Sequence, residues 1–117
     1  MQDFRNLMVW QKGHRLTLAI YRATIGFPDE EKFGLISQIR RAASSVPINI
    51  PEGCGREGNK ELARFLQISM GSASELKYLL LLARDLKYLP AESYMTLNSQ
   101  VIEVKSMLAP LINHLRK

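Results

Sequence analysis

The sequence predicts an all-α protein, an antiparallel up-down-up-down four-helix bundle that forms one domain over residues 1–117. Apolar residues recur at spacings of three and four in four separate stretches, which is the period of an amphipathic helix. Glycine and proline residues separate these stretches, and no stretch shows the sustained alternation that is typical of strands. Short connections between helices of about 20 to 30 residues favour packing of sequence neighbours in opposite directions.

Residues 7–25 form the first predicted helix and carry two apolar stripes instead of one. At about 100° per residue, the two stripes lie more than a quarter-turn apart, so one bundle core does not cover both. The stripe expected to face the core consists of Leu7, Trp10, His14, Leu18, Tyr21 and Ile25. The second stripe consists of Val9, Gly13, Leu16, Ile20 and Ala23.

The other three predicted helices cover residues 36–50, 62–83 and 94–115. Each carries an apolar stripe at the same three-and-four spacing. Pro47 and Pro110 lie inside two of these helices, where a proline removes a backbone hydrogen bond. Because the apolar pattern continues through both prolines, we expect kinked helices that do not end there.

The breaks between the predicted helices contain the residues that end or begin helices. Gly26 and Pro28 separate the first two, and a glycine-rich segment at residues 53–58 separates the second from the third. Asn59 is placed to cap the third helix, and Pro90 suits the first turn of the fourth.

The composition is that of an ordinary globular protein with an excess of basic residues. Sixteen Lys and Arg against 11 Asp and Glu give a net charge of +5, and no basic run or tail concentrates it. This excess fits a solvated surface and a nucleic-acid footprint equally well. A single cysteine excludes an intramolecular disulfide and a Cys-rich zinc site. The sequence has neither an apolar run of membrane-spanning length nor a signal peptide, so we expect a cytoplasmic location.

The surplus apolar surface of the first and third helices predicts a homo-oligomer, because exposed apolar patches of this extent usually mark interfaces. The alternative is a thicker apolar face within a monomer. The residues predicted to form the oligomer interface are Val9, Leu16, Ile20, Met70, Leu81 and Tyr88.

No arrangement of residues in the sequence points to a reaction. The pattern G-x-G-x-x-G starts at Gly53, but a helical pattern precedes it, whereas the dinucleotide fingerprint requires a strand there. This segment is either a plain connection or a phosphate site beside Arg56 and Lys60. Cys54 is expected to be accessible but has no neighbouring base, and no metal-ligand spacing occurs. We therefore predict a protein that is not an enzyme and has no catalytic, cofactor or metal residues.

Polar residues follow one face of the second predicted helix, beside its apolar stripe. They form either a structural network, in which Arg41 pairs with Glu52 or Glu75 across the bundle, or a ligand surface. Arg40 points away from this row and is expected to be freer to meet a phosphate. The residues assigned to the network are Gln38, Arg41, Ser45, Asn49, Glu52 and Glu75.

Residues 38–53, QIRRAASSVPINIPEG, resemble the signature of the proteins encoded in intervening sequences of bacterial 23S rRNA genes. Further matching segments follow the same order along nearly the whole chain: FRNL at 4–7, VWQ at 9–11, FP at 27–28, RFL at 64–66 and GSASEL at 71–76. Pro51 departs from this pattern, because the family usually has alanine there, and it leaves the end of the second helix open.

The resemblance implies a small four-helix bundle that assembles as a ring-like homopentamer. It also implies kinship with the accessory proteins of diversity-generating retroelements, which bind nucleic acid and a reverse transcriptase through a basic surface. A pentamer would multiply the +5 charge of each chain fivefold.

The resulting hypothesis is an oligomer that binds RNA or DNA through phosphate contacts, largely independently of sequence and with strong salt dependence. The alternative is an oligomeric scaffold that docks a protein partner without binding nucleic acid. The predicted phosphate contacts are Arg15, Arg22, Arg40, Arg56, Lys60, Arg64 and Arg84.

Overall fold

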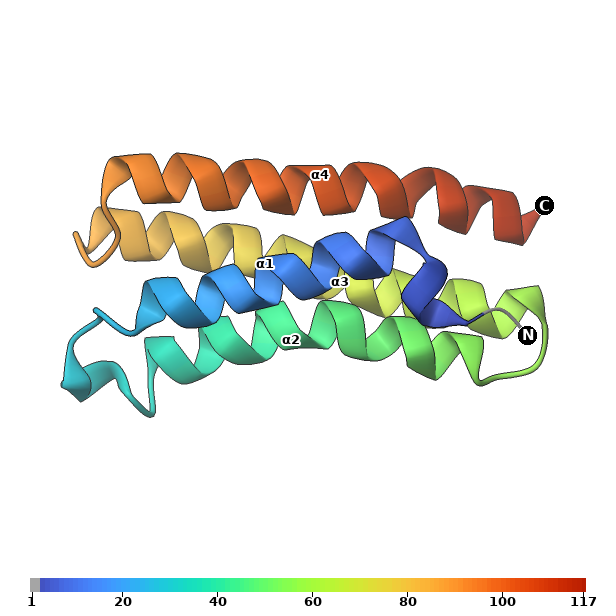
Figure 1. Ribbon diagram of the computed structural model, residues 1–117, viewed down its shortest axis with the longest axis horizontal. Coiled ribbons are helices and arrows are strands. Elements are labelled where there is room, and N and C mark those ends of the chain that lie inside the picture. The colour runs from blue at the N-terminus through green and yellow to red at the C-terminus, as the bar shows by residue number, and fades with distance from the viewer. Residues whose placement is uncertain (1–2) are drawn as a thin grey trace.

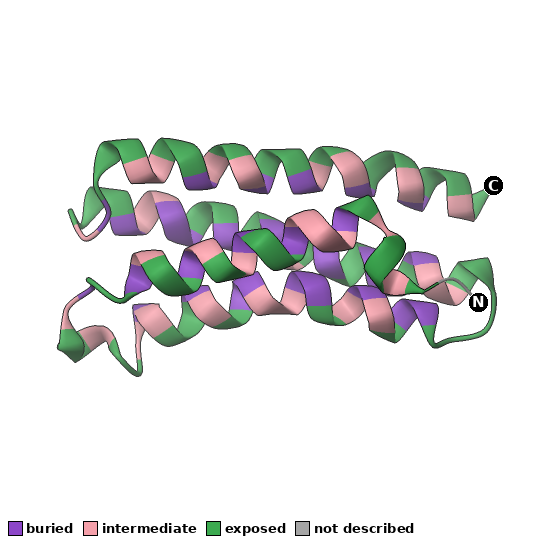
Figure 2. Cartoon of the chain, viewed as in Figure 1, coloured by how far each residue is buried: buried purple, intermediate pink, exposed green. Residues whose placement is uncertain are grey.

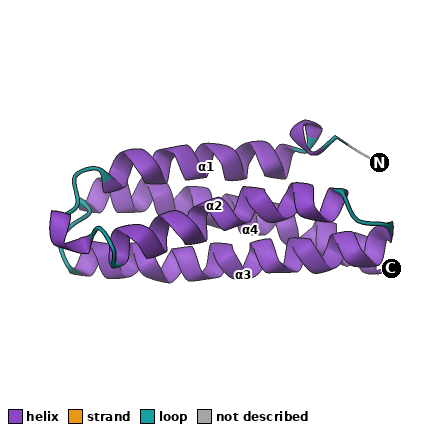
Figure 3. Ribbon diagram, turned by 90° about the horizontal axis from the view of Figure 1, so that it is seen from below, coloured by secondary structure: helices purple, strands orange, loops and turns teal. Residues whose placement is uncertain are grey.

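Four long helices dominate the computed structural model, which describes residues 3–117. They are α1 (Met8–Thr24), α2 (Leu35–Cys54), α3 (Gly58–Asp85) and α4 (Ala91–Arg116), with the short 3-10 helices η1 (Phe4–Asn6) and η2 (Asp29–Glu31). Over these residues there is no strand, which confirms the all-α class (Figure 3). The helices lie side by side in a body that measures 43 × 23 × 20 Å.

The connections between the helices lie at alternating ends of the molecule (Figure 1). The α1–α2 and α3–α4 connections lie at one end, and the α2–α3 connection lies at the other end with η1 and the end of α4. Helix α1 packs against α2 and α4, and α3 packs against the same two helices. The four helices therefore enclose one core, and α1 and α3 are on opposite sides of it.

Helix α3 begins one residue before the predicted capping position. Gly58 has a positive φ of 84°, and Glu57 precedes the helix without a side-chain cap, so Asn59 lies inside the first turn. Helix α2 continues through Pro47 and α4 continues through Pro110, as the uninterrupted apolar pattern predicts. Helix α2 also continues through Pro51, where the sequence left its end open, and it ends at Cys54.

Helix α2 tolerates Pro47 in part because a hydroxyl of α1, whose single proton is shared between two carbonyls, approaches the carbonyl that loses its donor. A proline has no N–H, so the carbonyl of Ala43 loses its helical donor four residues later. The Thr17 hydroxyl of α1 lies 3.1 Å from this carbonyl oxygen and 2.9 Å from the carbonyl oxygen of Gly13. Gly13 lets the helices approach closely, because a β-carbon there would lie 3.1 Å from Val46 Cγ1.

The core consists of branched aliphatic residues contributed by all four helices (Figure 2). Complete burial of an aliphatic side chain of this size contributes roughly 1.5–3 kcal/mol relative to exposure. The large aliphatic side chains below 2% exposure are Leu16, Ile20, Ile39, Val46, Ile50, Leu66, Leu76, Leu80, Val101, Val104 and Leu108.

The assignment of the two stripes on α1 is wrong, because the second stripe faces the core. Leu16 and Ile20 are fully buried within their own chain and Val9 is 3% exposed, so these three residues are not available as an oligomer interface. The stripe predicted to face the core is largely outside it. His14 is exposed, and Leu18, Tyr21 and Ile25 are 42%, 43% and 75% exposed.

The other three predicted interface residues, Met70, Leu81 and Tyr88, are half-buried. Met70 and Tyr88 pack against the core, and the Tyr88 hydroxyl donates a hydrogen bond to Glu31 at 3.1 Å. Their apolar surface is thus covered in part by their own chain.

Thr17→Val keeps the shape of the side chain and removes the donor to Ala43, so we expect a loss of about 1–3 kcal/mol in the free energy of unfolding. Pro47→Ala restores a backbone donor to Ala43. The change that it causes in the free energy of unfolding should therefore be more favourable when Thr17 is already Val than in the wild type, so the cycle compares the wild type, both single variants and the double variant. Urea unfolding followed by circular dichroism measures all four proteins of this cycle.

The matched control is Thr96→Val, because the exposed Thr96 hydroxyl bonds only to Glu92 of its own helix. This change should alter stability by no more than about 0.5 kcal/mol. Equal losses for the two threonines would contradict the role assigned to Thr17.

Candidate nucleic-acid interface

The predicted phosphate contacts lie in three places. Arg56, Lys60 and Arg64 meet at the end of the bundle where α2 connects to α3. Arg84 lies near the other end of α3, about 30 Å away at 1.5 Å per residue. The remaining three, Arg15, Arg22 and Arg40, lie on α1 and α2.

Two of the clustered arginines stack on a single aromatic ring. The guanidinium carbons of Arg56 and Arg64 lie 5.0 Å and 4.5 Å from the centre of the Phe65 ring, and Phe65 itself is only 8% exposed. Such cation–π contacts orient a guanidinium group while its N–H edge stays available. Sequence reasoning missed this role, although Phe65 directly follows Arg64.

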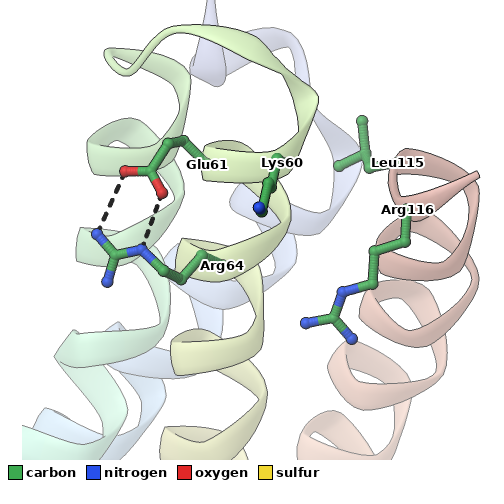
Figure 4. Close-up of a pocket in the computed structure, with 5 residues that line it drawn as sticks. All are labelled: Lys60, Glu61, Arg64, Leu115 and Arg116. Atoms are coloured by element: carbon green, nitrogen blue, oxygen red, sulfur yellow. Dashed lines mark hydrogen bonds and ion pairs between the residues drawn. The ribbon is translucent and has the colours of Figure 1, made fainter.

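A pocket of about 470 Å³ lies beside this cluster, between α3 and α4. Its lining residues are Lys60, Glu61, Arg64, Leu115 and Arg116 (Figure 4). Arg116 was not among the predicted contacts, because it lies about 50 residues from the others and no motif marks it. Its place in the last turn of α4 brings it to the same end of the bundle.

Glu61 and Arg64 form an ion pair at the edge of the pocket. The Arg64 guanidinium donates to both carboxylate oxygens of Glu61, at 3.0 Å and 3.3 Å. These hydrogen bonds lower the pKa of Glu61 and raise the pKa of Arg64, so both groups are charged at neutral pH. Lys60 and Arg116 have no ion pair among residues 3–117.

The arginines outside this cluster differ in whether their guanidinium groups already have partners within the chain. The prediction that Arg40 is free is wrong, because its guanidinium stacks on Tyr21 at 4.6 Å and donates to Thr24 Oγ1 at 2.8 Å. Arg84 stacks on Tyr94 at 4.7 Å and pairs with Asp85. Arg15 and Arg22 are exposed, and neither forms an ion pair within the described part of the chain.

Comparison with protein families matches residues 5–110 to the 23S rRNA-intervening sequence protein family. The chain belongs to this family. A crystal structure with a similar fold is that of a protein of unknown function from the S23 ribosomal protein family of Bacteroides thetaiotaomicron VPI-5482. The two are 24% identical with a TM-score of 0.81, over 90% of this chain and 98% of that one, which shows a shared fold. A comparison with curated proteins finds no match.

The segment that carries the resemblance to this family contains the polar row on α2, and only its middle forms a network. Ser72 Oγ of α3 donates to Ser45 Oγ at 2.8 Å, and Asn49 Nδ2 donates to the same oxygen at 3.0 Å. The expected pairing of Arg41 is wrong for residues 3–117, because Arg41 forms no ion pair there.

The outer members of the row stay outside this network. Gln38, Arg41 and Glu75 are exposed. Glu52 lies 3.8 Å from Arg56, one turn later, instead of pairing across the bundle. The structure therefore supports a local network of Ser45, Asn49 and Ser72 between α2 and α3, not the predicted network of six residues.

In the glycine-rich segment of this family member, Gly53 serves helix packing. A β-carbon at Gly53 would lie 2.8 Å from Leu62 Cδ1 and 3.0 Å from Phe65 Cβ, so the glycine permits close contact between α2 and α3. Cys54 is buried, contrary to the expected accessibility, because it lies in the last turn of α2 and faces the core. Burial raises the pKa of its thiol.

No group of three or more His, Cys, Asp or Glu side chains within residues 3–117 could hold a metal ion. No helix in this range has the length and apolar character needed to cross a membrane.

The buried thiol should react slowly with a thiol reagent. We expect labelling of Cys54 in the native protein to be at least about tenfold slower than in urea, because the thiolate is the reactive form. Since the folded pKa is raised, stability should also fall as pH rises above the ordinary thiol value of about 8.5. Cys54→Ala should lose this part of the pH dependence in unfolding experiments. Equal labelling rates in the native and unfolded states would contradict burial.

Proposed function

We propose that this protein is a non-enzymatic bundle of antiparallel up-down-up-down helices that binds RNA or DNA in the cytoplasm as a ring-like homopentamer. The alternation of loop ends in Figure 1 supports the helix order. Binding is largely independent of sequence, because Lys and Arg contact phosphates and displace condensed counterions.

The observation that carries this proposal is the cationic end of the bundle. Arg56, Lys60, Arg64 and Arg116 lie together there. Glu52 and Glu61 pair with Arg56 and Arg64, so these four cations exceed the two carboxylates by two charges. Stacking on Phe65 reduces the conformational entropy that Arg56 and Arg64 lose when they bind a phosphate. A surface that serves only solubility does not require such ordered guanidinium groups.

The exposed stripe of α1 supports assembly with further copies. Leu18, Tyr21 and Ile25 share one side of the helix and are 42%, 43% and 75% exposed. Contiguous apolar surface of this kind is typical of an interface. We therefore place the contact between copies on this stripe. It replaces the interface predicted at Val9, Leu16 and Ile20, which are buried. Five copies arranged around an axis would combine their positive ends into a stronger field.

A filter-binding titration with structured RNA at several salt concentrations tests the nucleic-acid proposal. We expect affinity to fall steeply with salt, and the double change Arg56→Gln with Lys60→Gln should reduce the logarithmic slope by roughly 1.5 to 2. The matched control is Lys77→Gln with Lys105→Gln, which removes the same charge away from the cluster. Absence of binding at about 50 mM salt would contradict the proposal.

Light scattering on the purified protein tests the assembly. We expect a particle several times heavier than the 13.3 kDa chain at micromolar concentration. Leu18→Glu with Tyr21→Glu should yield the single chain, because burying unpaired carboxylates in an interface costs several kcal/mol. Met95→Glu on α4 is the control, since Met95 is 69% exposed and outside the stripe. A wild-type particle of one chain would exclude the assembly.

A second candidate function is an oligomeric scaffold that docks a protein partner. It is favoured by the apolar tip of the α1–α2 connection, where Phe33 is 91% exposed and Ile25 lies close by in sequence. The salt titration separates the two functions, because this alternative predicts no RNA binding at low salt.

A further inference from the structure

The pocket between α3 and α4 brings together cations from two distant parts of the sequence. Lys60 and Arg64 come from the first two turns of α3, and Arg116 comes from the last turn of α4. In Figure 4 the Arg116 side chain points from α4 toward α3, and Lys60 is drawn between Arg116 and Arg64. Leu115 supplies an apolar wall to the pocket.

The charge inside this pocket is not balanced. Glu61 is the one carboxylate among its lining residues, and Arg64 bonds to both of its oxygens at 3.0 Å and 3.3 Å. Lys60 and Arg116 have no carboxylate within ion-pair distance among residues 3–117. Three cations and one carboxylate therefore leave two positive charges facing a pocket of about 470 Å³.

Two unpaired positive charges suit the charge of a phosphate at the end of a nucleic-acid strand better than that of a phosphate inside it. A phosphate at the end of a nucleic-acid strand is a monoester with a charge between about −1.5 and −2 at neutral pH, and it has three free oxygens. A phosphate inside the strand is a diester with a charge of −1. The planar guanidinium of Arg116 can bind two oxygens at once, and the Lys60 ammonium adds a point charge.

We propose that this pocket binds the terminal phosphate of an RNA or DNA strand, with Lys60 and Arg116 as its main contacts. The inference rests on the proposed nucleic-acid binding and makes it more specific, because it assigns a preference for one kind of strand end. Arg64 is held by Glu61 and Phe65, and it contributes its remaining N–H group and its charge.

Fluorescence anisotropy with short single-stranded RNAs tests this preference. Three otherwise identical strands carry a 5′-phosphate, a 3′-phosphate or hydroxyl groups at both ends, with the dye inside the strand. We expect about tenfold tighter binding of at least one phosphorylated strand than of the hydroxyl strand, because hydrogen bonds between charged groups are stronger than those of a terminal hydroxyl. The two phosphorylated strands distinguish a 5′ end from a 3′ end as the source.

Arg116→Gln should abolish this tenfold difference, and the loss of its charge should also weaken binding of all three strands by a similar factor. The matched control is Lys77→Gln, because Lys77 is an exposed cation of α3 outside the pocket, and this variant should keep the difference. Thermal unfolding of each variant confirms that the fold is intact.

The possible results separate this inference from the proposed function. Salt-sensitive binding of all three strands with equal affinity would overturn the terminal-phosphate site and keep nucleic-acid binding. A preference that persists in Arg116→Gln would overturn the assignment to this pocket. Failure of all three strands to bind at low salt would overturn both.

Discussion

The missing hydrogen bond at Pro47 determines how α1 packs against α2. The proline leaves the Ala43 carbonyl in the middle of α2 without its helical donor, and a carbonyl that lacks a partner in a helix contact costs free energy. Thr17 supplies a hydroxyl 3.1 Å away, and Gly13 on the preceding turn removes the β-carbon that would hold the helices apart. Both residues must face α2 at the same time, which leaves α1 a single rotation about its axis.

That rotation fixes which apolar stripe of α1 is buried. With Gly13 and Thr17 against α2, the side chains of Leu16 and Ile20 point into the core and become fully buried. Tyr21 is then at the edge of the α1–α2 contact, where Arg40 covers its ring at 4.6 Å. Leu18 and Ile25 remain outside, so the apolar surface available to a second copy follows from the packing of one proline.

The sequence was sufficient to predict the elements of the fold but not their rotation. The apolar spacing correctly predicted four helices, the breaks between them and the continuation of α2 through Pro47. These features could be predicted because periodicity depends only on residues within one helix. Both stripes of α1 are equally apolar, so periodicity could not choose between them. Thr17 helps to set the rotation of α1, but in the sequence it is one polar residue among others until its partner on α2 is known. Arg116 was missed for the same reason, since only the packed bundle brings it to Lys60.

The arginines of this protein show why a modest net charge is compatible with a local excess of positive charge. Arg40, Arg64 and Arg84 each lie within 5 Å of the centre of an aromatic ring, and each also bonds to a neighbouring polar group. The guanidinium of Arg40 is thereby held in the contact between α1 and α2, and Arg84 lies near the far end of α3, away from the cations of the pocket. At Arg64 the same kind of stacking has a different effect, because Lys60 and Arg116 lie beside it without carboxylate partners of their own. The positive charge that each of these cations presents to solvent therefore depends on the groups that the fold places next to it, and not on the total of +5.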